Sequence, residues 1–149
     1  MIIKDILDQE DRDPLGIESG RSLEDAVNLM VDHNRSALIV MEGDRPVGIF
    51  TERDLLLSHS RIKPGKLSGI PLKNAMTNKL IVAKPEDKID SAIALMIQTG
   101  IRHLPVVEGG HIISLLNMCD LVQYQVENLS TELRYLEEYL NDLHDAGRD

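Results

Sequence analysis

The sequence predicts an α/β (α+β) protein of two repeats, each a short sheet with two helices on it, packed as a pseudo-twofold pair and followed by a C-terminal helix. The first observation is an internal repeat: residues 15–57 align with residues 81–123 without a gap, and nine of the 43 aligned pairs are identical. The second is that both halves have the pattern helix, strand, glycine turn, strand, helix. The third is a leucine-rich stretch of helical period after the second half. Ligands usually bind in clefts between such paired repeats, so the pattern predicts a binding module.

Each repeat begins with a short apolar segment and a helix. IKDIL (3–7) is echoed by LKNAM (72–76). Ser22 is a good N-cap residue, and Asp25 complements the positive end of the helix that follows it. Apolar residues at helical spacing predict that one face of each helix lies in the core: Leu23, Ala26, Val27, Met30 and Val31, and in the copy Ile89, Ala92, Ile93, Met96 and Ile97.

Two apolar runs in each half predict a hairpin. The run at 36–42 turns at Gly43-Asp44 into the run at 46–50, and the run at 103–108 turns at Gly109-Gly110 into the run at 111–116. Both turns contain residues that tolerate positive φ. A second helix is predicted after each hairpin, from TERDLLLSH in the first half and from NMCDLVQYQ in the second.

The predicted domain boundaries follow the repeats. The first repeat covers 1–60, a linker 61–70, the second repeat 71–127, and a C-terminal amphipathic helix and tail 128–149. Near the C-terminus, apolar residues recur at alternating spacings of four and three: Val122, Val126, Leu129, Leu133, Leu136, Leu140 and Leu143. This spacing favours a coiled-coil helix for self-association or signal output; the alternative is a helix that lies against its own domain.

Composition narrows the class of protein. A repeat of about 60 residues is marginal alone, so the two halves of this 149-residue chain are expected to fold as one body. The net charge of −9 argues against non-specific binding to nucleic acid or to anionic membranes. No stretch is long and apolar enough for a membrane span, and the N-terminus lacks the pattern of a signal peptide. With Cys119 as the one cysteine, a cytoplasmic protein is expected.

The pair Thr51 and Asp54 lies where a predicted strand leads into a helix. One interpretation is purely structural, a capped helix start. The other is a ligand site, in which Thr51 offers a hydroxyl to a phosphate and Asp54 accepts hydrogen bonds from the hydroxyls of a sugar. The aspartate recurs as Asp120, which favours the second interpretation.

These motifs resemble those of the CBS domain, and a tandem pair resembles a Bateman module. The resemblance covers about residues 2–127, and its most specific segments are GIFTERDL (48–55) and GIRHLPVV (100–107), supported by LKNAMT (72–77). It implies that Thr51 contacts a phosphate and that Asp54 holds the ribose of an adenosine nucleotide bound between the repeats. The second half departs from the family pattern, because Ser114 replaces the glycine and Asn117 the threonine, whereas Asp120 is retained. The two clefts are therefore expected to be unequal.

The resemblance also implies a contact zone at the start of each central strand. In the first half Ser36 and Ala37 are small enough to let a base approach the backbone. In the second half Ile101, Arg102 and His103 occupy this zone, and the latter two bring positive charge toward a phosphate. The structural alternatives are a surface ion pair for Arg102 and a half-buried imidazole for His103. Arg53 is a further candidate, although charged helix residues usually face solvent.

The sequence contains no pattern that indicates catalysis. The histidines lack metal-ligand spacing, Cys119 has no pattern of residues to activate it, and no phosphate-binding glycine loop is present. We therefore expect a non-catalytic regulatory module, and the resemblance implies that it senses an adenosine nucleotide. AMP is the leading ligand, with ADP, ATP, NAD and S-adenosylmethionine as others. A homodimer is expected, with an unidentified regulated protein as a further partner. The alternative is a dimerisation or interaction protein that acts through its C-terminal helix and has vestigial clefts.

Overall fold

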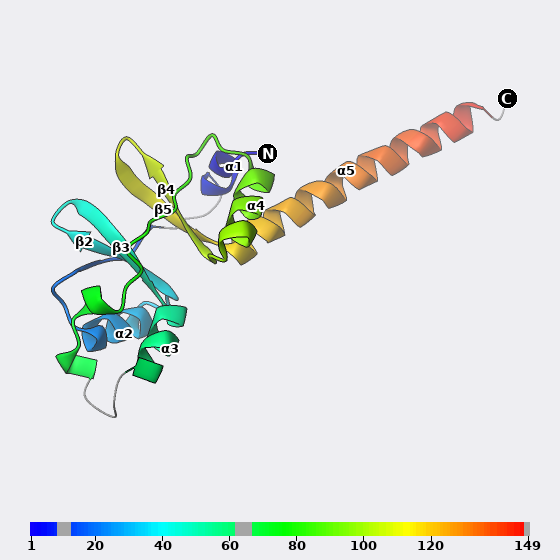
Figure 1. Cartoon of the computed structure of the whole chain (residues 1–149). Coiled ribbons are helices and arrows are strands. Elements are labelled where there is room, and N and C mark those ends of the chain that lie inside the picture. Colours follow the sequence, from blue (N-terminus) through cyan, green and yellow to red (C-terminus); the bar gives the residue numbers. More distant parts are fainter. Residues whose placement is uncertain (9–12, 62–66, 148–149) are drawn as a thin grey trace. The chain divides into compact units, whose positions relative to one another are not determined.

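The computed structural model describes residues 1–8, 13–61 and 67–147 (Figure 1). Part of the predicted linker, residues 62–66, lies outside the described residues. The chain forms two compact units. The sheet unit contains residues 12–82 and 105–115, and the helix unit contains residues 1–11, 83–104 and 116–149.

The sheet unit is built on a three-stranded sheet in the order β1-β2-β3. Strand β1 (Gly16–Glu18) runs parallel to β2 (Ala37–Glu42), and β2 pairs antiparallel with β3 (Arg45–Thr51) through the Gly43 turn. Helix α2 (Leu23–Asp32) joins β1 to β2, and α3 (Glu52–Arg61) follows β3. Two short 3-10 helices follow, η1 (Leu67–Gly69) and η2 (Leu72–Asn74). The strands and helices predicted for the first repeat are thus present, and β1 is an addition that its three-residue length concealed.

The helix unit contains α1 (Ile3–Leu7), α4 (Ile89–Thr99) and α5 (Met118–Ala146). Strands β4 (His103–Glu108) and β5 (His111–Asn117) form a two-stranded sheet, and residues 105–115 of it belong to the sheet unit. The bounds of these strands match those of β2 and β3 at the predicted offset. Helix α5 is much longer than its counterpart α3, and Figure 1 shows it running out past α1 and α4. No helix among the described residues is long and apolar enough to span a membrane.

Five positions were predicted to face the core in the first helix of each repeat: three are buried, one (Val27 and its counterpart Ile93) is half-buried, and one is exposed. Leu23, Ala26 and Met30 are buried in α2, as are their counterparts Ile89, Ala92 and Met96 in α4. In contrast, Val31 is 71% exposed and its counterpart Ile97 is 69% exposed. Because a helix turns by about 100° per residue, Val31 lies roughly 100° around from the middle of the buried stripe, beyond the reach of the core.

The opening segments of the two repeats each pack with the other repeat's sequence. In the helix unit, the Ile3 N–H donates to the Asp87 carbonyl over 2.9 Å, and the Ile89 N–H donates to the Met1 carbonyl. In the sheet unit, the Leu72 N–H donates to the Arg21 carbonyl over 2.9 Å. Leu72 is fully buried there in a cluster with Leu23, Phe50 and other residues of the first repeat. The opener of the second repeat therefore completes the core of the first, and this exchange places residues 76–77 beside β3.

Candidate functional site

The first candidate site forms where β3 ends and α3 begins. The Asp54 carboxylate accepts from the Thr51 N–H at 3.0 Å and from the Thr51 hydroxyl at 3.3 Å, and the Asp54 N–H donates back to that hydroxyl over 3.4 Å. This is the reciprocal capping arrangement that a Thr-x-x-Asp spacing predicts. Asp54 is only 9% exposed, so these donors stabilise the charge of its carboxylate away from water.

Thr77 is a third partner of the carboxylate, and sequence reasoning gave it no role. Its hydroxyl donates to Asp54 Oδ1 over 3.0 Å, while its backbone exchanges two 2.9 Å hydrogen bonds with Ile49 of β3. Thr77 ends the LKNAMT segment, which served in the sequence only as support for the family resemblance. What the sequence does not reveal is that this opener packs with the first repeat rather than the second.

Gly48 makes the approach of residues 76 and 77 to β3 feasible. A Cβ atom at Gly48 would lie 2.8 Å from the sulfur of Met76 and 2.8 Å from the carbonyl oxygen of Thr77. A backbone oxygen cannot move aside as the end of a flexible side chain can. The glycine of the motif thus accommodates a neighbouring chain segment in this structure.

The start of β2 lies beside the same helix end. The Ser36 carbonyl accepts the Glu52 N–H at 3.1 Å, and Ala37 is opposite Thr51 in the β2–β3 register. The structure therefore brings together Ser36, Ala37, Thr51 and Asp54, which we call the first half-site. The Arg53 side chain is exposed, as charged residues on a helix surface commonly are.

A second half-site repeats this arrangement in the helix unit. The Asn117 N–H donates to the Asp120 carboxylate over 3.0 Å, and the Asp120 N–H donates to Asn117 Oδ1 over 2.9 Å. The Arg102 carbonyl accepts the Met118 N–H at 2.9 Å, which is the counterpart of the bond between Ser36 and Glu52. Asp120 is 6% exposed, so its carboxylate is buried much like that of Asp54.

A residue with a left-handed backbone conformation lies shortly before each central strand and determines where that strand begins. Gly100 ends α4 at φ 73°, and its counterpart Asn34 has φ 50°, a conformation that asparagine tolerates better than most residues. The next residue of each copy, Ile101 or Arg35, then donates its N–H back into the preceding helix. In the second half-site Arg102 is exposed, whereas Ile101 and His103 are half-buried.

The two half-sites differ in how firmly the capping side chain is held. The bond from the Asp120 N–H to the Asn117 amide oxygen has an ordinary length, 2.9 Å. Both bonds of the Thr51 hydroxyl, 3.3 Å and 3.4 Å, are longer than well-formed hydrogen bonds of their kinds. The Thr51 hydroxyl is therefore weakly engaged and can turn to another partner at little cost, whereas Asn117 is committed to its helix.

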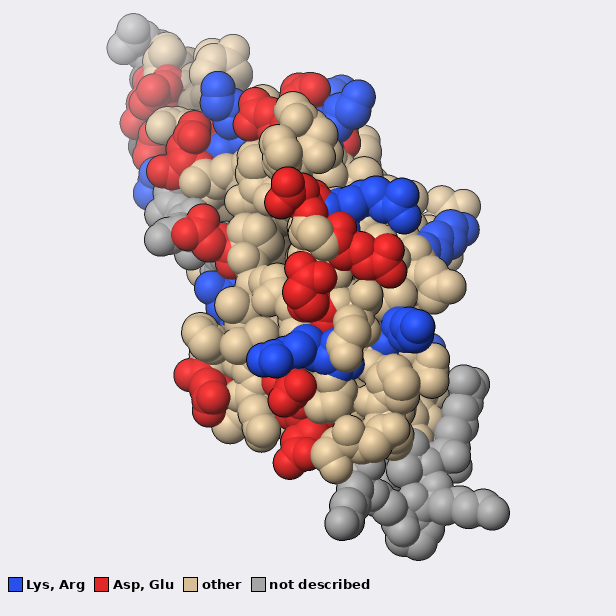
Figure 2. All heavy atoms as spheres, turned by 90° about the vertical axis from the view of Figure 1, so that its left-hand side faces the viewer, with Lys and Arg blue, Asp and Glu red and all other residues tan. Residues whose placement is uncertain are grey.

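The described residues contain no group of three or more His, Cys, Asp or Glu side chains that could hold a metal ion. Figure 2 shows acidic and basic side chains interspersed over one face of the molecule. The chemistry that the half-sites can supply is hydrogen bonding, from hydroxyl, carboxylate and backbone groups at two helix starts.

Comparison of the sequence with known proteins identifies the family of this chain. The sequence matches the CBS domain over residues 3–60 and again over residues 72–127. It is 37% identical over 122 residues to the CBS domain-containing protein CBSX3, mitochondrial, of Arabidopsis thaliana, covering 78% of this chain and 58% of that protein. The CBS domain-containing protein YhcV of Bacillus subtilis is 28% identical over 114 residues, covering 76% of this chain and 80% of that protein.

Solved structures share the fold. The CBS-domain containing protein ATU1752 from Agrobacterium tumefaciens superimposes with a TM-score of 0.77 at 27% identity, covering 84% of this chain and 99% of that one. The CBS domain pair of protein MJ0100, in complex with 5-methylthioadenosine and S-adenosyl-L-methionine, has a TM-score of 0.71 at 22% identity, covering 83% of this chain and 98% of that one. With two CBS domains matched over most of its length, the chain belongs to the CBS-domain family, whose paired domains are regulatory modules.

Proposed function

We propose that this chain is a non-catalytic sensor that binds an adenosine nucleotide at the first half-site. AMP is the leading ligand, and ADP, ATP, NAD and S-adenosylmethionine are the others to test. The repeats at 1–60 and 71–127 supply the two half-sites, and binding changes the conformation or the association of the protein. A ligand can produce such a change only by binding one state more tightly than the other.

The weakly held Thr51 hydroxyl beside a buried carboxylate is the observation that carries the proposal. A carboxylate has about four lone-pair positions, of which Thr51 and Thr77 occupy three. When the hydroxyls of Thr51 and Thr77 turn away, Asp54 can accept both hydroxyls of a ribose. Thr51 is then available to a phosphate at the start of α3, where the helix dipole favours an anion.

The second half-site serves the same ligand class less well. Its asparagine is engaged in capping α5 through the 2.9 Å bond from the Asp120 N–H. Arg102 is exposed near it and offers charge to a phosphate. We therefore propose one strong site and one weak site. That MJ0100, a protein of the same fold, holds adenosine-containing ligands makes this ligand class the first to test.

Calorimetric titration of nucleotide-stripped protein with the five candidates tests the proposal. We expect saturable binding of at least one, and a loss of roughly 100-fold or more in affinity in Asp54→Ala, because the sugar hydroxyls lose a charged acceptor. Asp25→Ala is the matched control, since it removes the same kind of capping carboxylate from α2 in the same unit. Affinity in Asp54→Ala equal to that of the wild type would contradict the assignment.

A second candidate function is supported by the exposed apolar side chains of α5. In that case the chain is an interaction or dimerisation protein that acts through its C-terminal helix, and the half-sites are vestigial. The two functions are separable, because the first requires nucleotide binding and the second does not. We propose a homodimer in both, with an unidentified regulated protein as a further partner of the sensor. No response to any of the five nucleotides would favour the second.

A further inference from the structure

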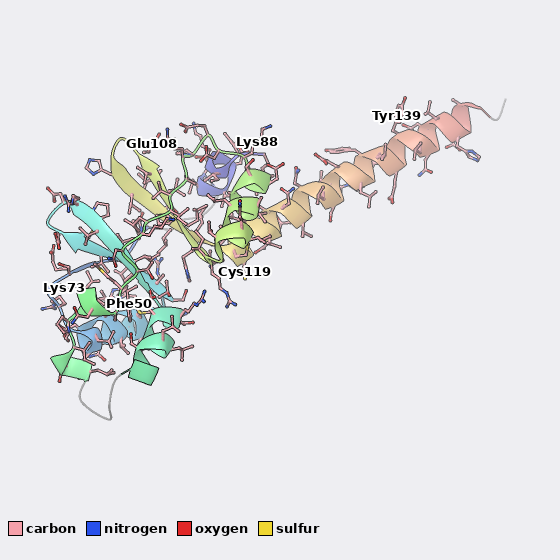
Figure 3. All side chains as sticks on the ribbon, in the orientation of Figure 1. Phe50, Lys73, Lys88, Glu108, Cys119 and Tyr139 are labelled. Carbon is pink, nitrogen blue, oxygen red and sulfur yellow. The ribbon has the colours of Figure 1, made fainter. Side chains whose placement is uncertain are left out.

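Helix α5 has two apolar faces, and its own unit covers only one of them. Leu121 and Tyr124, near the start of the helix, are buried in the helix unit. A separate stripe on another side of the helix is exposed along its whole length, and we call it the α5 seam: Cys119, Val122, Val126, Leu129, Leu133, Leu136, Leu140 and Leu143. Figure 3 shows α5 from Cys119 at its start to Tyr139 near its far end. The seam is thus distinct from the surface by which α5 attaches to its unit.

The spacing of the seam matches a second helix of the same kind. Its positions alternate by three and four residues, which is a period of 3.5 residues per turn. A stripe with this period keeps facing a partner helix when the two helices supercoil around each other. On a straight α-helix, the same stripe gradually rotates away from its neighbour. From Cys119 to Leu143 the seam is roughly 36 Å long.

The residues that flank the seam favour a second copy of this chain over a partner of opposite charge. They are Gln123, Gln125, Ser130, Glu132, Glu137, Tyr139 and His144. Such positions select oppositely charged partners when they are charged throughout. Here only Glu132 and Glu137 are acidic, so little in the flanks opposes self-pairing.

Charge along the helix decides the orientation of the two copies. The second half of α5 carries five acidic residues and one basic residue, Arg134, between Glu132 and Asp145; the first half carries two acidic residues, of which Asp120 is buried. Parallel pairing would bring two acidic halves side by side and set Glu132 against Glu137 twice. Antiparallel pairing sets each acidic half beside the less charged half and leaves one contact of Glu132 with its own copy.

The sizes of the seam residues point the same way. In the antiparallel register of greatest overlap, each small or β-branched residue of the first half meets a leucine of the second, and the pairs are Cys119 with Leu143, Val122 with Leu140, Val126 with Leu136 and Leu129 with Leu133. Parallel pairing would instead stack valine on valine and leucine on leucine. It would also place Leu133 and Leu140 at the a positions, where parallel dimers favour β-branched residues.

We propose that two copies of the chain associate through their α5 seams in antiparallel orientation, with Cys119 of one copy opposite Leu143 of the other. This inference rests on the homodimer part of the proposed function and is independent of nucleotide binding. Sedimentation equilibrium measures the association, and disulfide mapping measures the orientation of the two copies. A wrong orientation can therefore be distinguished from a lack of association.

Sedimentation equilibrium of the full chain tests the association. In this register Leu133→Asp puts a carboxylate into both central layers, so the dissociation constant should rise by about 100-fold or more. Tyr135→Asp is the matched control: Tyr135 is 62% exposed and Leu133 57% exposed, but Tyr135 lies off the seam. It should change the dissociation constant by less than about 3-fold. A monomeric wild-type protein, or a dimer unaffected by Leu133→Asp, would overturn the proposal.

Disulfide mapping tests the orientation, using the natural cysteine. The wild-type dimer should not crosslink under mild oxidation, because its two Cys119 residues lie roughly 36 Å apart in the antiparallel pair. Leu143→Cys should yield a crosslinked dimer in which mass spectrometry finds only links between positions 119 and 143. The same variant with Cys119→Ser should not crosslink. Links from 119 to 119, or from 143 to 143, would establish the parallel arrangement, and a dimer of Leu143→Cys without any link would exclude the proposed register.

Discussion

At the residue scale, Thr51 and Asn117 occupy equivalent positions but are bound differently. Asn117 makes a capping bond of 2.9 Å, whereas the bonds of the Thr51 hydroxyl are 3.3 Å and 3.4 Å. A group held this weakly contributes little to its own helix, which is why we assign it to a ligand.

Thr51→Val should weaken AMP binding by about 10-fold or more, because the phosphate loses a hydroxyl donor. Binding of adenosine should change by less than about 3-fold, since adenosine carries no phosphate. Calorimetry with both ligands measures the ratio, and Ser22→Ala, which removes the N-cap of α2 in the same unit, controls for the loss of a cap. An equal loss for AMP and adenosine would show that Thr51 supports the fold of the site rather than the phosphate.

The bonds within the half-sites could be predicted from sequence, but the contact with Thr77 could not. A Thr-x-x-Asp or Asn-x-x-Asp spacing at a helix start determines which groups are within reach of each other, because only three residues separate them. Thr77 is 23 residues from Asp54, and its bond depends on the path of the chain through the opener. Local spacing carries information about the first kind of contact and none about the second.

At the element scale, the internal repeat of the sequence predicted the helices and strands well. It predicted poorly which segments pack against one another. Strands β2 and β4, and likewise β3 and β5, have bounds that agree at the constant offset seen in the sequence. The openers at 3–7 and 72–76 were recognised as equivalent, but each packs with the other repeat's sequence. Both choices of partner bury the same apolar residues, so hydrophobic pattern alone does not distinguish them. The exposed Val31 and Ile97 show the same limit, because a helical pattern does not show how far the core extends around the helix.

The contact of β3 with residues 76–77 predicts that Gly48→Ala destabilises the sheet unit. The added Cβ would lie 2.8 Å from the Thr77 carbonyl oxygen, so the free energy of unfolding should fall by about 1–3 kcal/mol. Chemical denaturation measures the loss. Gly20→Ala is the control, since nothing lies within 4 Å of its Cβ position, and its stability should change by less than about 0.5 kcal/mol. Equal stability of the two variants would mean that the 76–77 segment can shift away from β3.

At the scale of the whole molecule, the compact units do not coincide with the repeats of the sequence. The helix unit combines the N-terminal opener with residues 83–104 and the C-terminal region, and the sheet unit combines most of the first repeat with residues 105–115. The repeats therefore describe how the sequence is organised, and the units describe how the chain is packed. Along α5, none of the residues beyond Tyr124 is buried, so this region contributes little to the core of its unit.

Deleting residues 128–149 should therefore separate self-association from ligand binding. Among the residues of this segment that the structure describes, 128–147, none is buried, so the fold and the affinity for nucleotide should be retained, with a change of less than about 3-fold in the dissociation constant. It removes most of the α5 seam, so the protein should become monomeric in sedimentation experiments. Deleting residues 145–149, which lie beyond Leu143, should leave the dimer intact and serves as the control. A truncated protein that remains dimeric would place the interface elsewhere, and one that loses nucleotide binding would show that the C-terminal helix supports the site.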